Sequence, residues 1–497
     1  MEATRFAHMK SSSIKRIGLF IGLIAAVLVF IFADLGPENY NARLTASIAA
    51  LMSVWWIFEA IPLAATALIP LVLFPILGIV NAKQTSQAYM NSTIFLFMGG
   101  FIIAIAMEKW NLHKRIALNL ISLFGSNPSR IIMGFMVASA FISMWISNTA
   151  TAVMLLPIGL AILYKLEDQF GAERIRNFSI SLLLGIAYAC SIGGIATFIG
   201  TPPNLVFRKI YAITFPARPE ISFGQWMSFG VPMMLILLVA AWAILVKLVY
   251  RIDKNLSIDP RVIKQEKDKL GKITYEEKNV LIVFVITAFL WIFRTKLDLG
   301  FLQIPGWSGL FSKPEFIDDG TVAITMSLIL FLLPVKNKKD DEIAILDFST
   351  IRKVPWDIIL LFGGGFALAD GFVSTGLSDI IGRQFTVLNN FPIFILIIGV
   401  SITITFLTEL TSNTATAQII LPILAALSIE LKIDPLILMI PATMSASMAF
   451  MMPVATPPNA IVFSSQRLRV FDMAKAGLLL NLIGAVVITL FVYFIFV

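Results

Sequence analysis

One polar triplet, Ser-Asn-Thr, occurs twice in this sequence, each time within a strongly apolar stretch. The first copy begins at Ser147 and the second at Ser412, 265 residues further along (412 − 147). Over the eleven residues that start at each serine, eight are identical between the copies. Polar side chains in an apolar setting cost free energy unless a partner satisfies them. The duplication therefore indicates one binding site that is assembled from two halves.

A second polar motif, Thr-Pro-Pro-Asn, is also duplicated, at 201–204 and 456–459. Because proline lacks an amide donor, each motif should break a helix and leave carbonyl groups free. Such carbonyls, together with Ser, Thr and Asn oxygens, suit a small hard cation. Amides at the start of a half-helix suit the carboxylates of an anion. Ser143 and Thr408 stand four residues before the triplet serines, and we expect each hydroxyl on the same helix face as its serine.

The composition is that of a membrane protein. The chain has 497 residues, of which 58% are hydrophobic and only 14% are charged, whereas about a quarter of the residues in soluble domains are charged. Many apolar runs reach the ~20 residues that a membrane-spanning helix needs. No alternating pattern suggests a membrane β-barrel. The predicted fold class is therefore an all-α polytopic membrane protein.

Hydropathy predicts about eleven transmembrane helices and two re-entrant hairpins. The expected spans are 17–33, 44–60, 61–80, 92–108, 178–203, 223–250, 279–294, 320–335, 356–373, 436–463 and 474–497. The hairpins are expected at 130–163 and 391–430, each with a Ser-Asn-Thr tip near its middle. Non-helical backbone at membrane depth survives only where protein or a cavity covers it.

Basic residues orient the chain, because cytoplasmic loops are enriched in Lys and Arg. The loops 251–278 and 335–354 hold eight and five basic residues and are expected inside, whereas the acidic loop 295–319 is expected outside. One segment disagrees, since the same topology places Arg208, Lys209 and Arg218 outside. We expect a multi-pass protein of the cell (inner) membrane, with a cytoplasmic N-terminus and an external C-terminus.

The repeat extends beyond the polar motifs. The glycine-rich residues 96–101 match 361–366 at the same spacing of 265 residues. The two glycine spans cross in opposite directions in the expected topology, so the halves, roughly 43–250 and 279–497, are inverted repeats. Inverted repeats with broken helices near the midplane are typical of secondary transporters. The glycines themselves favour close helix packing over ligand contact.

Two amphipathic segments and two acidic residues can each be interpreted in two ways. The amphipathic segments 111–124 and 375–388 are expected to be either connecting arms along the interface or loops with some helix. Glu409 and Asp370 lie near membrane depth and are either functional carboxylates or carboxylates tied to backbone amides or neighbouring hydroxyls.

The segments that carry the polar motifs contain no charge. Residues 131–162, 178–204 and 436–463 include no Lys, Arg, His, Asp or Glu. A dianion bound there without compensation would be prohibitively unfavourable. Bound cations, one for each repeat, would supply the missing positive charge, which favours cation-coupled symport over plain exchange.

Motifs of enzymes and pumps do not occur in the sequence. We find no Walker loop, no HExxH, no Gly-x-Ser-x-Gly and no Cys/His cluster with metal-ligand spacing. The single cysteine, Cys190, excludes a disulfide within the chain. The net charge of +8 is spread over short loops and does not indicate a nucleic-acid partner. We therefore expect a non-enzymatic protein whose surroundings are the lipid bilayer.

At these motifs the sequence resembles the divalent-anion/sodium symporter family, the INDY-like di- and tricarboxylate carriers. The resemblance covers essentially the whole chain, and the run 446–462 matches the family's signature pattern. It implies a homodimer with elevator-type alternating access, in which each protomer has a scaffold domain and a moving transport domain. The scaffold would comprise 1–128 and 279–390, and the transport domain 129–250 and 391–497, each part of which contains a hairpin and a broken helix.

The resemblance also implies the site residues. One sodium site would use Ser143, Ser147, Asn148 and the carbonyl of Gly200. The other would use Thr408, Ser412, Asn413 and the carbonyl of Ala455, which stands where the first half has glycine. Substrate carboxylates would meet Asn148, Thr149, Thr201, Asn413, Thr414, Thr456 and Pro457. About two or more sodium ions are implied as coupling ions.

The expected function is sodium-coupled symport of C4-dicarboxylates such as succinate, malate or fumarate. Alternatives on the same fold are a sodium-independent dicarboxylate or citrate exchanger and a sulfate carrier. Some exchangers of the resembled family have a basic residue in place of sodium, and the site segments here contain none. A third alternative, an intramembrane enzyme, has no support in the sequence.

Overall fold

Helices make up most of the described chain, as its long apolar runs predict. The computed structural model describes residues 2–33, 35–36, 38–253, 256, 261–298, 303–336, 343–385, 388 and 390–497, with side chains from residue 14 onward. Three of the lysines counted above in the basic loops, Lys254, Lys338 and Lys339, lie outside the described residues, as does part of the expected segment 375–388.

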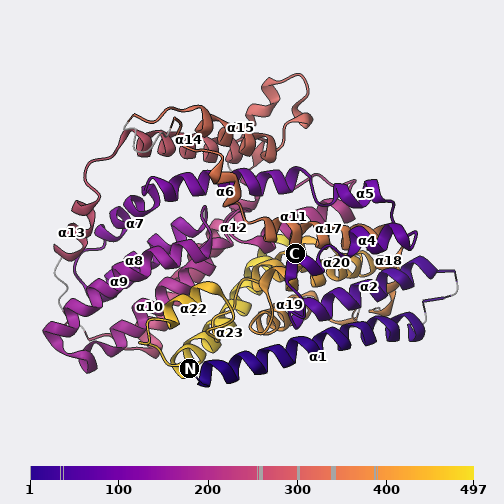
Figure 1. The fold of residues 1–497 in the computed structure, drawn as a ribbon, viewed down its shortest axis with the longest axis horizontal. Helices are drawn as coiled ribbons and strands as arrows, with labels where there is room; N and C mark the ends of the chain where they lie inside the picture. Colours follow the sequence, from indigo (N-terminus) through magenta and orange to yellow (C-terminus); the bar gives the residue numbers. More distant parts are fainter. Residues whose placement is uncertain are drawn as a thin grey trace.

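The described residues of the first half form helices α1 to α12, most of which are labelled in Figure 1. They are α1 Glu2–Phe32, α2 Tyr40–Ile57, α3 Leu63–Thr66, α4 Ile69–Ile76, α5 Ala82–Gln87, α6 Ser92–Lys109, α7 Leu112–Ser122, α8 Pro128–Ser143, α9 Asn148–Phe170, α10 Ala172–Gly194, α11 Pro202–Thr214 and α12 Phe223–Ala243. A π-helical segment, Ile244–Val249, continues α12.

The second half adds helices α13 to α23 and one short β-ribbon. The helices are α13 Arg261–Lys269, α14 Tyr275–Ile292, α15 Asp319–Leu332, α16 Ser349–Arg352, α17 Trp356–Ser374, α18 Leu377–Gln384, α19 Ile393–Thr408, α20 Asn413–Glu430, α21 Leu436–Ser445, α22 Pro457–Phe463 and α23 Val470–Phe496. The ribbon pairs β1 Leu297–Asp298 with β2 Gln303–Ile304 in antiparallel register, and 3₁₀ turns follow at Trp307–Leu310 and Pro314–Phe316.

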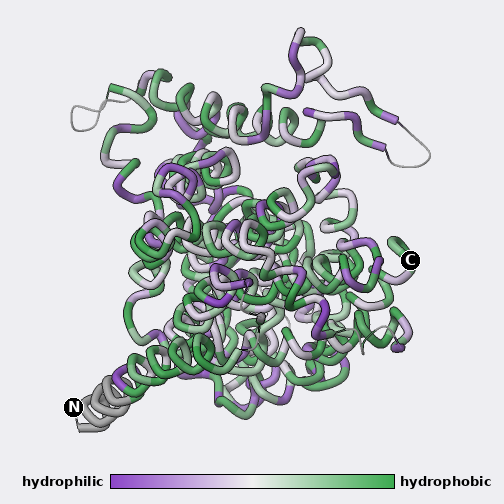
Figure 2. Tube along the Cα trace, turned by 90° about the vertical axis from the view of Figure 1, so that its right-hand side faces the viewer, coloured by the Kyte–Doolittle hydropathy of each residue, from purple (hydrophilic) through white to green (hydrophobic). Residues whose placement is uncertain are grey.

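The expected polytopic helical architecture is confirmed. In the described part of the chain, eight helical stretches are long and apolar enough to cross a membrane, and shorter apolar helices lie among them. Figure 2 shows hydrophobic residues along most of the bundled helices, with hydrophilic residues mainly at turns and loops.

The expected span 61–80 contains an apolar helical stretch, Leu63–Ile76, but not one continuous helix. The chain instead forms two short helices, α3 and α4, that meet near Ala67. Prolines explain the difference, because Pro70 lies in the first turn of α4 and Pro75 lies inside it. The hydroxyl of Tyr89 donates a hydrogen bond to the carbonyl of Ala67 at the junction.

The two halves repeat the same order of elements. A glycine helix, a short helix, a hairpin, a broken helix and a final long helix follow one another as α6, α7, α8–α9, α10–α11 and α12, and again as α17, α18, α19–α20, α21–α22 and α23. Both hairpins and both broken helices are thus confirmed. The segments around 111–124 and 375–388 contain the short helices α7 and α18.

The glycine runs serve close packing, as expected. A Cβ on Gly99 would lie 2.6 Å from the backbone carbonyl carbon of Ala323 on α15. A Cβ on Gly364 would lie 2.6 Å from the Cα of Ala67. Only glycine allows these backbones to approach so closely.

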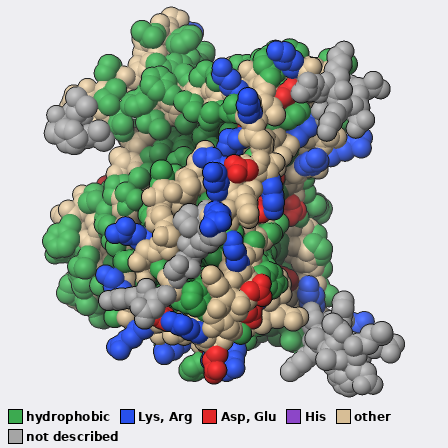
Figure 3. Space-filling view, turned by 90° about the vertical axis from the view of Figure 1, so that its left-hand side faces the viewer, with side chains coloured by type: hydrophobic (Ala, Val, Ile, Leu, Met, Phe, Trp, Pro, Cys, Tyr) green, Lys and Arg blue, Asp and Glu red, His purple; other side chains and the backbone are tan. Residues whose placement is uncertain are grey.

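The repeats interlock around the motif segments. Helix α22 of the second repeat packs against α9 and α10 of the first, and α11 of the first packs against α20 and α21 of the second. In Figure 1, α7 to α10 run side by side towards the left-hand end of the molecule. Figure 3 views that end and shows Lys and Arg side chains spread across it.

Candidate functional site

The first Ser-Asn-Thr triplet forms the tip of the α8–α9 hairpin. Helix α8 ends at Ser143, and α9 begins at Asn148 with Ser147 as its N-cap residue. The Ser147 hydroxyl accepts a hydrogen bond of 3.2 Å from the amide of Ala150, which satisfies one of the free donors at the helix start. The remaining amides of this first turn point towards the tip.

Three oxygens meet beside this tip. The Ser143 hydroxyl is hydrogen-bonded to Oδ1 of Asn148 and lies 2.8 Å from the carbonyl oxygen of Cys190 on α10. A hydroxyl has only one proton to share between these two acceptors. The result is an electron-rich group of oxygens, which we call the first oxygen cluster.

The expectation that Ser143 and Ser147 share one helix face is wrong. Helix α8 ends at Ser143, and Ser147 lies beyond the turn as the N-cap residue of α9. The Ser143 hydroxyl is oriented by the turn and reaches Asn148, not Ser147.

The second tip repeats the arrangement. Oγ1 of Thr408 lies 2.6 Å from Oδ1 of Asn413 and 2.9 Å from the carbonyl oxygen of Ala446. We call these atoms the second oxygen cluster. Helix α19 ends at Thr408 and α20 begins at Asn413, so the tip has the same length as the first. The Ser412 side chain makes no capping hydrogen bond.

The asparagines of the Thr-Pro-Pro-Asn motifs hold the helix breaks together. Nδ2 of Asn204 donates to the carbonyls of Gly194 at 3.1 Å and Thr197 at 2.7 Å. Nδ2 of Asn459 donates to the carbonyls of Ala449 and Met452, each at 3.1 Å. These bonds satisfy carbonyls that the interrupted helices leave free, so both asparagines have a structural role.

The first break also meets the first oxygen cluster. A Cβ added to Gly194 would lie 3.0 Å from Oδ1 of Asn148, 3.1 Å from the carbonyl oxygen of Gly200 and 3.2 Å from Cβ of Thr201. The structure therefore brings Asn148, Gly200 and Thr201 together, as expected. Glycine leaves the space between them open.

The other expected site residues are spread over the same two tips and breaks. In the first half, Thr201 is buried and Thr149 is exposed at its tip. In the second half, Thr414 and Thr456 are buried, and Oγ1 of Thr456 accepts a bond of 3.4 Å from the amide of Asn459. Ala455 is half-buried and its amide donates to Met452, while Pro457 is exposed. Their roles as ligands stay predictions.

Glu409 is tied to backbone amides, which decides between the two interpretations given above. Its carboxylate accepts bonds from the amides of Phe450, Met451 and Met452 at 2.7, 2.8 and 3.1 Å, and from Nδ2 of Asn481 at 2.7 Å. Four donors satisfy a buried carboxylate well. Glu409 thus anchors the second tip to the second break and to α23.

Asp370 makes none of the contacts that form the two oxygen clusters. It is half-buried on α17 and interacts electrostatically with Lys209 of α11. Its position fits a structural contact between these two helices.

The structure contains a buried charge cluster that the sequence pattern does not predict. Arg208 of α11 is 4% exposed and lies 2.9 Å from Oδ2 of Asp319, which is fully buried. Oδ1 of Asp319 accepts a bond of 2.6 Å from Nε of Arg294. Arg208 therefore belongs to a buried ion pair, and this explains why it disagreed with the loop-charge pattern.

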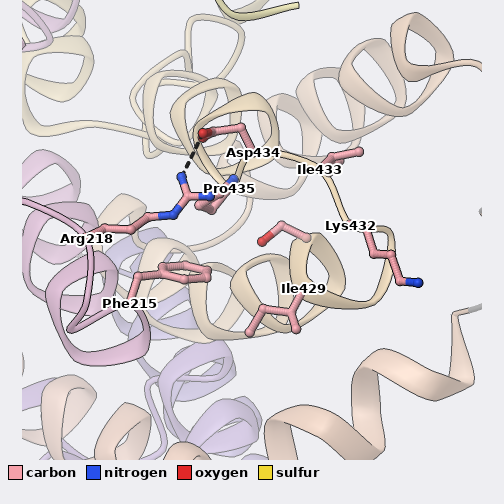
Figure 4. A pocket seen from close by; sticks show the side chains of 8 residues that line it. Phe215, Arg218, Ile429, Lys432, Ile433, Asp434 and Pro435 are labelled. Carbon is pink, nitrogen blue, oxygen red and sulfur yellow. Dashed lines mark hydrogen bonds and ion pairs between the residues drawn. The ribbon is translucent and has the colours of Figure 1, made fainter.

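Two cavities differ in their relation to the tips. One, of about 380 Å³, lies between the end of α11 and the α20–α21 turn, where Arg218 and Asp434 form an ion pair of 2.7 Å (Figure 4). It contains no tip residue. The other, of about 390 Å³, is lined by one face of α6, by Lys353, and by Ser147 and Ala150 of the first tip.

Known proteins resemble this chain over nearly its full length. A family model described as "Sodium:sulfate symporter transmembrane region" matches residues 13–496. A protein of Staphylococcus saprophyticus named sodium-dependent dicarboxylate transporter SdcS is 42% identical over 98% of this chain and 93% of its own length. The SdcS protein of Staphylococcus aureus strain MRSA252 is 43% identical over 99% and 94%. The crystal structure of the YdaH transporter of Alcanivorax borkumensis is 12% identical, with a TM-score of 0.56 over 84% of this chain and 87% of that one, and shares the fold.

Proposed function

Because this chain belongs to the sodium:sulfate symporter family, we propose that it is a secondary transporter that carries C4-dicarboxylates with sodium ions. The observation that carries the proposal is the pair of oxygen clusters, one at each hairpin tip. Each places a hydroxyl, an amide oxygen and a backbone carbonyl together, the hard ligands that a small cation prefers. The names of the SdcS relatives support both the ion and the substrate class.

Sodium binds at the two clusters in this proposal. The first ion would be held by Ser143, Ser147, Asn148 and the carbonyl of Gly200. The second would be held by Thr408, Ser412, Asn413 and the carbonyl of Ala455. A bound cation would turn each hydroxyl proton away from the shared oxygens, and this would fix the tip asparagine in place.

The dicarboxylate binds between the tips once sodium is present. Its carboxylates would meet Asn148, Thr149, Thr201, Asn413, Thr414, Thr456 and Pro457, together with the amides at the starts of α9 and α20. The segments that carry the tips and breaks include no basic residue, so the two sodium ions would supply the compensating charge. Substrate binding would then depend steeply on sodium.

Transport would follow an elevator movement in a homodimer. The transport domain, 129–250 and 391–497, would slide against the scaffold, 1–128 and 279–390. The interlocking of α9, α10 and α22, and of α11, α20 and α21, supports treating both tips as one moving body. Helices α7 and α18 would connect the two domains.

The conformation would be open towards the cytoplasm. The 390 Å³ cavity reaches Ser147 from the side of Lys353, which belongs to a loop expected inside. The basic face in Figure 3 would be the cytoplasmic face of a multi-pass inner-membrane protein. The N-terminus would be cytoplasmic and the C-terminus external.

Radiolabelled succinate uptake into proteoliposomes tests the proposal. With nothing inside, an inward sodium gradient should drive accumulation, and potassium or choline gradients should not. Uptake that ignores sodium and requires internal dicarboxylate would identify an exchanger. Competition by sulfate without competition by succinate would identify a sulfate carrier.

A further inference from the structure

The cavity beside the first tip contains charges that the oxygen clusters do not use. It has a volume of about 390 Å³, within the range of small-molecule sites. Two of its lining residues, Ser147 and Ala150, belong to the tip itself. The others come from α6 and from Lys353, just before α17. A solute in this cavity is therefore in contact with the tip.

One helical face forms the wall of the cavity. Phe101, Ile105 and Glu108 follow one another at helical spacing on α6, so they lie on one side of that helix. The wall is apolar except at its last turn, where the carboxylate of Glu108 lies. This arrangement suits a short dianion, because its methylene carbons would meet the apolar wall and its carboxylates would meet the polar ends.

Lys353 is the cation that faces Glu108. Both side chains line the cavity, where the positive charge of Lys353 acts against the effect of burial on the Glu108 carboxyl group, and Lys353 is exposed. Lys109 also lines the cavity, but its ammonium lies 3.5 Å from Asp347 and 5.4 Å from the centre of the Trp110 ring. The mouth thus has one cation whose counter-charge, Glu108, lines the same cavity.

The positions that correspond to these two residues in the opposite repeat are uncharged. At the spacing that relates the two tips, Glu108 corresponds to Val373, and Lys353 corresponds to Ala88. This combination of a lysine and a glutamate is therefore specific to one side of the duplicated site.

We propose that this cavity is an inner docking site for the dicarboxylate, in which Lys353 captures one carboxylate and delivers the substrate to the Ser147–Asn148–Thr149 tip. Glu108 competes with the substrate for the ammonium of Lys353, so capture and release remain balanced. The proposal rests on the proposed transport of dicarboxylates and adds a step on one side of the membrane only.

In this proposal the substrate carboxylate and the Glu108 carboxylate exchange at the ammonium group of Lys353. A basic residue at the mouth of a low-dielectric cavity raises the local concentration of an anionic solute. A cation without a competitor would retain the dianion and slow its passage to the tip. Glu108 provides that competitor without moving with the substrate, since it belongs to α6.

Membrane vesicles of opposite orientation show on which side of the membrane a substitution acts. In everted vesicles added succinate meets the cytoplasmic side of the transporter, and in right-side-out vesicles it meets the external side. Lys353→Gln should raise the KM for succinate about fivefold in everted vesicles and leave it within about twofold in right-side-out vesicles. Glu108→Gln should change the KM in the opposite direction, lowering it about twofold in everted vesicles.

Two control variants test whether the effect of Lys353→Gln comes from the lost charge at that position. Lys353→Arg should retain the wild-type KM. Arg352→Gln removes an exposed neighbouring cation that lies over the Phe348 ring and does not line the cavity, and it should have no effect. Added choline chloride should reduce the effect of Lys353→Gln, because salt screens an exposed charge.

The outcomes distinguish this proposal from the proposed function. If wild-type vesicles accumulate no succinate with sodium, the proposed function fails. If the wild type transports, equal KM changes at both mouths, a change confined to right-side-out vesicles, or no change would each overturn the inner docking site. A rise in KM for Glu108→Gln would overturn the role of Glu108 as competitor.

Discussion

The two hairpin tips share one oxygen cluster but are anchored in different ways. At the first tip, the Thr197 hydroxyl donates to the carbonyl of Met144 and accepts from the amide of Gly200 at 3.1 Å. At the second tip, Glu409, 265 residues after Met144, accepts three backbone amides and the amide of Asn481. The cluster is thus a property of the motif, whereas its attachment depends on unrelated neighbours.

These two anchors hold the tips with different strength. Hydrogen bonds to an ionised carboxylate are roughly twice as strong as those between neutral groups. The second tip is therefore bound more firmly to its break than the first, which also borders the cavity near Lys353. We expect the first tip to respond more readily to sodium.

Removing either tip asparagine tests what the tips share. Asn148→Ala and Asn413→Ala each delete an oxygen of one cluster and should reduce sodium-driven succinate uptake more than about tenfold. Size-exclusion profiles should be unchanged. Wild-type uptake by either variant would contradict the equivalence of the two clusters.

Glu409→Gln tests the stronger anchor. The neutral amide cannot accept all four bonds as well, and its NH₂ group would face backbone amides, so the free energy of unfolding should fall by about 2 kcal/mol or more. Thermal unfolding in detergent measures this change. Met144→Leu, at the equivalent first-repeat position, should cost less than about 1.5 kcal/mol. Equal losses would remove the distinction between the anchors.

The hydroxyls of the clusters test cation binding directly. Ser143→Ala and Thr408→Ala should each raise the half-saturating sodium concentration for uptake about tenfold, because one ligand is lost. Ser143→Thr and Thr408→Ser keep the hydroxyl and should remain close to the wild type. An alanine variant with unchanged sodium dependence would argue against a sodium site at that tip.

Thr197→Val tests the weaker anchor. The variant keeps the shape but removes two neutral hydrogen bonds, so the free energy of unfolding should fall by about 1–2 kcal/mol, less than for Glu409→Gln. Hydrogen exchange at the 144–147 turn, measured by mass spectrometry, should increase, while exchange at 409–412 should not. Thr197→Ser should restore protection. Increased exchange at both turns would show that the anchors are coupled.

The sequence predicted the parts of this fold that are local and duplicated. Repetition identified the hairpins and helix breaks, because two copies of a costly polar motif rarely arise from packing alone. Hydropathy located most helices but missed the interruption near Ala67, where prolines divide an apolar run.

Contacts between residues that lie far apart in the sequence could not be predicted from repeats or hydropathy. Glu409 lies 41 residues before Phe450 along the chain, and Arg208 lies more than a hundred residues before Asp319. No periodicity links such residues, so only the folded chain shows that both charges are satisfied. The unexpected position of Arg208 outside the basic loops was the one sequence signal, and it pointed to a buried partner without naming it.

Cys190 can be replaced to make a cysteine-free protein for site-directed labelling. Its backbone carbonyl takes part in the first oxygen cluster, while its buried thiol is the only one in the chain. A serine or alanine at this position keeps the carbonyl and yields a cysteine-free background. Pairs of spin labels could then be placed on the exposed faces of α9 and α20. The distances between them, measured by electron paramagnetic resonance, would show whether the two tips move as one body.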